Sequence, residues 1–173
     1  HSFLAVTITT AMELLLRSAL ASMSTNDEDD AELESRRAEA VSLCTETLAA
    51  QALYESIFST FPTYHGKQVS RSARDSLGLN GPSLVYGEIE FSSFFATMEI
   101  VEEYAEETRV FYDLGSGAGK PVIAAALSSL NFEKCVGLEY LEPLVDASRE
   151  AAFVYEEKKP DDVETKVEFH RCD

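Results

Sequence analysis

A glycine-rich turn directly after a short apolar stretch is the part of the sequence best suited to chemistry. Residues 113–120 read Asp-Leu-Gly-Ser-Gly-Ala-Gly-Lys, so an acid leads and a glycine follows at every second position. Glycine has no Cβ and lets a backbone approach a ligand where any other residue would collide with it. The turn therefore predicts a small-molecule site whose wall is partly backbone.

Three common motifs do not fit the spacing of this turn. A nicotinamide-binding fingerprint needs glycine where Lys120 stands. A P-loop needs glycine in place of Leu114 and a hydroxyl residue in place of Pro121. A nucleophile elbow around Ser116 also needs glycine at position 114. The remaining pattern resembles the cofactor loop of class I S-adenosylmethionine-dependent methyltransferases.

The residues around the turn suit that cofactor. Asp113, at the end of the first expected strand, can accept a hydrogen bond from the cofactor's ammonium, directly or through water. The helix N-terminus at residues 120–121 offers N–H groups to its carboxylate. Glu139 lies 20 residues beyond Gly119, where an acid at the end of the next strand can take the ribose hydroxyls.

The elements that must position these residues alternate between strand and helix. We expect strands at 110–113, 134–138 and 166–170, separated by helices at 121–130 and 143–158. This order predicts an α/β, doubly wound Rossmann-like methyltransferase core, truncated after its third strand. Before it we expect a helix over 31–61, a loop or linker over 62–85 and a helix over 91–107. The predicted domains are a helical region with linker, 1–83, and the N-terminal half of a methyltransferase domain, 84–173.

A second motif narrows the family. Tyr86-Gly87-Glu88 stands about 25 residues before the glycine loop, which itself follows Phe-Tyr-Asp, and Cys-Val-Gly-Leu-Glu follows at 135–139. Together these segments resemble the Dot-one-like (disruptor of telomeric silencing) family, the non-SET methyltransferases of a histone H3 core lysine. The resemblance covers roughly residues 84–173. It implies that the Tyr-Gly-Glu loop closes over the cofactor. The implied cofactor-binding residues are Tyr86, Gly87, Glu88, Asp113, Gly115, Ser116, Gly117, Gly119, Lys120, Glu139 and Asp173.

Two departures limit what the resemblance implies. Lys120 stands where the family commonly has glutamine, and a cation beside a sulfonium must point at the cofactor's own carboxylate or at solvent. The chain also ends at Asp173, the position whose acid usually contacts the adenine amine. The fourth strand, whose Asn-rich segment lines the family's lysine channel, would follow. The catalytic residues are therefore unknown, and we expect the 173-residue fragment alone to be inactive.

Composition restricts the partners. The chain has 14 Lys and Arg against 31 Asp and Glu, a formal charge of −17, so we expect no direct nucleic-acid binding by this segment. The acidic stretches are most simply solvated faces, although an acidic rim can attract a basic histone tail. The family resemblance implies a basic protein substrate, histone H3 in nucleosomes. A histone enzyme also needs a basic nucleosome-docking segment, which at a charge of −17 we expect after Asp173 or on a partner. Three cysteines without paired spacing exclude a disulfide scaffold and a zinc knuckle, and we expect no metal.

Residues 1–22 are mostly apolar but too short and too polar to span a membrane. An amphipathic helix, a signal-like targeting segment and a true start at Met23 all stay open.

The sequence thus predicts S-adenosylmethionine-dependent methylation of a protein lysine, most simply the histone H3 core lysine, in the nucleus. The expected step is a direct displacement at the sulfonium methyl by a neutral amine. The alternatives are a class I methyltransferase acting on a non-histone protein or a small molecule, in the cytoplasm, and a catalytically inactive cofactor-binding or interaction module.

Overall fold

The computed structural model describes residues 30–79, 81, 85–102 and 109–172. Contacts divide the chain into two units, His1–Ala49 and Ala50–Asp173. The interpretations of residues 1–22 and the role of Asp173 lie outside the described residues. The domain boundary between residues 83 and 84 stays a prediction. No described helix is long and apolar enough to cross a membrane.

The first unit is described only through the N-terminal part of helix α2, Asp30–Ile57. Its side chains interact locally, as in the ion pair between Arg37 and Glu34 at 2.8 Å. Large apolar side chains stay exposed along it, including Val41 at 57%. The last turns of α2, from Ala50 onward, belong to the second unit, where Ile57 is buried.

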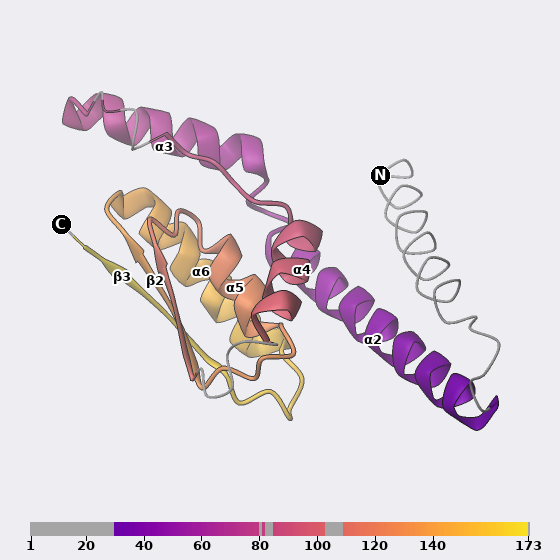
Figure 1. Ribbon diagram of the computed structural model, residues 1–173. Coiled ribbons are helices and arrows are strands. Elements are labelled where there is room, and N and C mark those ends of the chain that lie inside the picture. The colour runs from indigo at the N-terminus through magenta and orange to yellow at the C-terminus, as the bar shows by residue number, and fades with distance from the viewer. Residues whose placement is uncertain (1–29, 80, 82–84, 103–108, 173) are drawn as a thin grey trace. The chain divides into compact units, whose positions relative to one another are not determined.

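The second unit contains a parallel sheet in the order β1-β2-β3 (Figure 1). Its strands are β1 Val110–Leu114, β2 Lys134–Glu139 and β3 Lys166–Arg171, and its crossover helices are α5 Lys120–Ala126 and α6 Glu142–Lys158. The predicted alternation of strands and helices is confirmed, although α5 ends four residues earlier than expected. The structure is an α/β arrangement compatible with a truncated Rossmann-like core.

Both crossovers advance the sheet in the same direction, and right-handed crossovers therefore place α5 and α6 on one face (Figure 1). Phe111, Cys135 and Phe169 lie on this face, within the main hydrophobic cluster. Alternate residues of β1 point the other way. Tyr112 is 61% exposed and Leu114 78%, so the opposite face is open at β1.

Helix α4, Phe91–Glu102, packs on α5 and completes this core. Its phenylalanines at 91, 94 and 95 are buried, and Phe94 meets Phe111 edge-on with ring centroids 6.0 Å apart. The sequence predicts Phe94, Phe95, Phe111 and Phe153 as core residues rather than stacking platforms, and the structure confirms this for the first three. The prediction is wrong for Phe153, which is 64% exposed on α6. It lies off the stripe of this helix that buries Leu144, Val145, Ser148, Ala151 and Tyr155.

The predicted loop or linker over 62–85 is wrong for most of its length. Residues Thr63–Leu77 form helix α3, which follows Pro62 and ends at Gly78 with φ 68° and ψ 23°. The buried residues of α3 are Gly66, Ser70 and Ala73, so small side chains line its inner face. Because α3 contacts α6, this helix packs against the domain that carries the glycine loop.

Candidate functional site at the carboxyl end of the sheet

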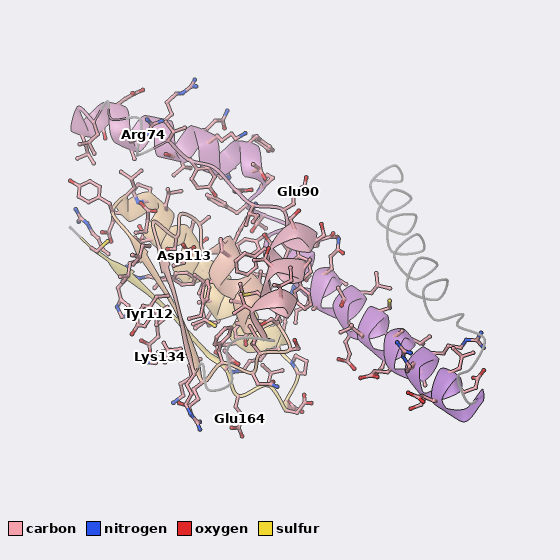
Figure 2. The ribbon with its side chains drawn as sticks, in the orientation of Figure 1. Arg74, Glu90, Tyr112, Asp113, Lys134 and Glu164 are labelled. Atoms are coloured by element: carbon pink, nitrogen blue, oxygen red, sulfur yellow. The ribbon has the colours of Figure 1, made fainter. Side chains whose placement is uncertain are left out.

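The glycine loop leaves β1 beside the carboxyl end of β2. The N–H groups of Gly115 and Ser116 donate to the carbonyl of Leu138 at 2.8 and 3.0 Å, which ties the loop to the neighbouring strand. Figure 2 shows Asp113 toward this end of the sheet and Lys134 toward the other. Ligands of open α/β sheets bind outside the carboxyl ends of the strands, so the loop lies where a ligand is expected.

Each glycine of the loop has positive φ, but their surroundings differ. Gly115, with φ 85°, has open space where a Cβ would stand. A Cβ on Gly117, with φ 55°, would stand 2.8 Å from the ring of Tyr86, and one on Gly119, with φ 83°, 2.4 Å from Phe169. The sequence predicts that these glycines allow a ligand to approach the backbone. At Gly117 and Gly119, the group that lies close to the backbone is an aromatic ring of the protein itself.

Glu139 is 8% exposed and holds the turn together. Its two carboxylate oxygens accept the N–H groups of Gly117 and of Leu141, each at 2.8 Å. A carboxylate offers about four lone pairs, so acceptor capacity remains after these two bonds. This position at the end of β2 is compatible with the ribose role expected for Glu139.

Asp113 differs from Glu139 in having no hydrogen bond or ion pair to any described residue. Burial, together with the negative charge of Glu139, raises the pKa of the Asp113 carboxyl above its ordinary value. The Ser116 hydroxyl is likewise buried without a hydrogen-bond partner among the described residues. A buried hydroxyl without a partner among the described residues, next to a partly buried carboxylate with a raised pKa, indicates a place for a ligand that brings a cation or hydrogen-bonding groups.

Glu88 receives hydrogen bonds from separate parts of the fold. Its Oε2 accepts from Lys120 Nζ at 2.7 Å and from the Thr63 hydroxyl, and its Oε1 accepts from the Tyr86 hydroxyl at 2.5 Å. Burial alone would raise the pKa of Glu88, but these hydrogen bonds and the charge of Lys120 outweigh it and hold the pKa below the ordinary value. Glu88 is thus an ionised carboxylate that accepts three hydrogen bonds from within the protein.

The Tyr86 ring lies between two glycines. A Cβ on Gly66 would stand 2.5 Å from its Cζ, and Gly117 faces the other side of the ring as described above. Burial, then the hydrogen bond to Glu88, raises the pKa of the Tyr86 hydroxyl far above its ordinary value. Tyr86 therefore remains a neutral donor.

The structure brings most of the predicted residues to one end of the sheet. Gly87 is an exception, because it is exposed and a Cβ at this position would meet nothing within 4 Å.

Four further residues of the site were not predicted from the sequence: Thr63, Gly66, Gly137 and Phe169. Thr63 and Gly66 lie in the segment predicted as a loop or linker. A Cβ on Gly137 would stand 2.4 Å from the Phe169 ring and 2.7 Å from the Ser116 hydroxyl oxygen. No group of three His, Cys, Asp or Glu in the described part of the chain could hold a metal ion.

Comparison with known families bears on the same segment. The family model described as "Histone methylation protein DOT1" matches residues 79–159. Residues 79–159 resemble the DOT1 family. The match includes the Tyr86–Glu88 loop, the glycine loop and Glu139, and it leaves out α3 and β3. It spans slightly less than half of the chain and confirms the predicted resemblance there; no curated protein matches the chain.

Proposed function

We propose that this chain forms part of an S-adenosylmethionine-dependent methyltransferase of the DOT1 kind that methylates a lysine of the histone H3 core. The observation that carries the proposal is the Asp113 carboxylate, which lies near Glu139 without a hydrogen-bond or ion-pair partner among the described residues, inside the segment that matches the DOT1 family. Partial burial and the negative charge of Glu139 both disfavour the ionised form of Asp113 and raise its pKa, and a ligand that brings a cation would offset both effects.

The residues present fit the cofactor. Asp113 would take the ammonium group, and Glu139 would use its remaining acceptor capacity for the ribose hydroxyls. The Ser116 hydroxyl, buried and unpartnered among the described residues, would gain a hydrogen bond from a polar group at the same end of the sheet. When bound, the cofactor supplies an electrophilic methyl group.

The substrate class follows from charge and from the family. The histone segment around a core lysine is basic, and a chain of formal charge −17 attracts such a segment at close range, whereas it repels the phosphates of nucleosomal DNA. Because the DOT1 family is described as methylating histones, histone H3 in chromatin, and hence the nucleus, is the substrate and place that we propose.

Calorimetric titration of the full-length protein with S-adenosylmethionine tests the cofactor site. We expect Glu139→Ala to lose about 1–3 kcal/mol of binding free energy, the scale of charge-assisted hydrogen bonds. Glu139→Ala also frees two loop N–H groups, so Asp113→Asn is the sharper variant because it breaks no bond to a described residue. We expect it to lose about tenfold or more in affinity, since one charge-assisted hydrogen bond contributes about 1.5 kcal/mol or more.

Glu164→Ala is the matched control, because Glu164 is exposed and lies toward the opposite end of the sheet from Asp113 (Figure 2). Unchanged affinity in both Asp113→Asn and Glu139→Ala would refute the cofactor site. Transfer of a radiolabelled methyl group to nucleosomes, abolished by either variant, tests the reaction itself. Binding without transfer to any histone would favour one of the two alternatives, a methyltransferase with another substrate or the inactive module.

A further inference from the structure

We propose that Thr63, Glu88 and Lys120 form a clamp that holds the Tyr86 ring against the glycine loop before any ligand arrives. In this arrangement Lys120 and Glu88 are positioning residues and not the cofactor contacts that the family resemblance implies. The effect of the clamp on cofactor exchange rests on the proposed function; the clamp itself does not.

The first argument is that Lys120 is fully engaged within the protein. Its ammonium lies 2.7 Å from Glu88 Oε2, 3.5 Å from the Thr63 hydroxyl and 5.5 Å from the centroid of the Phe58 ring. The Lys120 side chain is only 9% exposed. A buried ammonium paired in this way cannot also turn to a cofactor carboxylate without leaving Glu88 buried and unpaired, which is strongly unfavourable.

The second argument is that the clamp joins elements distant in sequence. Thr63 begins α3, Glu88 lies in the segment before α4, and Lys120 begins α5. Glu88 is the common acceptor, and its other oxygen holds the Tyr86 hydroxyl. Residues 85–90 therefore cannot leave the glycine loop without separating a buried ion pair.

The third argument is the fit of the Tyr86 ring. Gly66 on one side and Gly117 on the other leave no room for even a Cβ, so the ring has a single place to lie while the clamp is closed. The clamp thus fixes the distance between Tyr86 and the loop that would receive the cofactor. Its opening would limit how fast a ligand enters and leaves.

Hydrogen exchange of the full-length protein without ligand tests the clamp directly. We expect Lys120→Gln and Glu88→Gln each to speed exchange of the amides at 85–90 and 117–120 by about tenfold or more, because a buried charge or amide loses its partner. Thr63→Val removes one donor at an exposed position and should speed the same amides less. Lys134→Gln, at an exposed ion pair, is the control and should leave them unchanged.

Two further readouts keep the test decisive. In a double-mutant cycle, Lys120→Gln with Glu88→Gln should cost less than the sum of the single variants, as expected of partners. Stopped-flow binding should show faster cofactor dissociation in Lys120→Gln, whereas Asp113→Asn should change affinity without changing loop exchange. Unchanged exchange in folded Lys120→Gln and Thr63→Val would overturn the clamp. Failure of every form to bind cofactor would refute the proposed function while leaving the exchange result to stand.

Discussion

Two lysine–glutamate pairs in the same domain have nearly the same length and very different surroundings. Lys120 and Glu88 lie 2.7 Å apart with side chains 9% and 10% exposed. Lys134 and Glu168 lie 2.8 Å apart with side chains 38% and 39% exposed. The first pair joins the residue after the glycine loop to the Tyr86 segment, and the second bridges β2 and β3 on the face of the sheet opposite α5 and α6.

Because the two distances are nearly equal, burial and not distance decides how strongly the members of each ion pair depend on one another. In water the attraction at such a distance is small, and exposed pairs contribute little to stability. A buried pair gains more attraction but has given up its hydration, so its members depend on one another. In the exposed pair, Glu168 raises the pKa of Lys134 and Lys134 lowers the pKa of Glu168. This pair fixes no element other than the two strands that it joins.

The largest expected effect is self-association through the exposed side of β1. Within the described residues β1 is an edge strand, and its exposed Tyr112 and Leu114 form an apolar flank. Such an edge promotes association. We expect residues 1–173, expressed alone, to self-associate in light scattering. Tyr112→Lys should reduce the association, and association that is unchanged by this variant would contradict a role for this flank.

Removing one lysine from each pair sharpens the comparison. We expect Lys120→Met to lower the free energy of unfolding by about 3–5 kcal/mol, because it leaves Glu88 buried and ionised without its cation. Lys134→Met should leave the urea midpoint within experimental error, since Glu168 stays partly in water. Urea unfolding of both variants under the same conditions measures the difference.

A double variant checks the cause of this loss. Lys120→Met with Glu88→Gln removes both charges and should recover part of the stability lost by Lys120→Met alone. If the double variant is less stable than the single one, the loss comes from the packing of the Lys120 stem and not from the unpaired carboxylate.

Some elements of this fold can be predicted from the sequence and others cannot, and the difference lies in the kind of side chain that forms each element. The strands and the crossover helices follow from apolar runs and turn residues, and the glycine loop from its own spacing. The sequence does not predict helix α3. Its buried residues, Gly66, Ser70 and Ala73, recur at helical spacing, but their side chains are too small to give a hydrophobic pattern. Gly66 and the preceding Pro62 also read as breakers of structure, although Pro62 stands just before the helix begins.

The candidate site was predictable in its members but not in its contacts. The family resemblance brings Tyr86, Glu88 and Lys120 to one place, yet only the structure pairs Lys120 with Glu88. Thr63 gave no signal because a lone threonine at a helix start has many ordinary uses. Its role depends on a contact across 25 residues, and no pattern of local spacing reports such a contact.

The loop glycines test whether the Tyr86 contact matters at the candidate site. Alanine at Gly115 should cost about 1–2 kcal/mol, because the residue keeps a positive φ but meets nothing. Alanine at Gly117 should cost more, because its Cβ must displace the Tyr86 ring as well as adopt a positive φ. Urea unfolding compares the two variants. Equal losses would mean that the ring moves aside freely, and in that case the clamp does not hold it.

The smallest expected effect concerns two carboxylates of the site whose pKa values are shifted in opposite directions. The pKa of Glu88 is lowered in the folded protein, so Glu88 contributes stability above its ordinary pKa that is lost as the pH falls through the folded value. The pKa of Asp113 is raised, so the folded state holds that proton more tightly, and ionisation of Asp113 costs stability as the pH rises through the folded value.

The two variants should therefore respond to pH in opposite ways. Glu88→Gln should lower the urea midpoint at neutral pH, with a smaller loss in acid. Asp113→Asn should raise the midpoint slightly at neutral pH while weakening cofactor binding. This gain should vanish below a pH of about 4, where aspartate is protonated in both states. If Asp113→Asn instead lowers the midpoint at neutral pH, the carboxylate has a partner in the folded protein, and its proposed role as the site for the cofactor's ammonium is refuted.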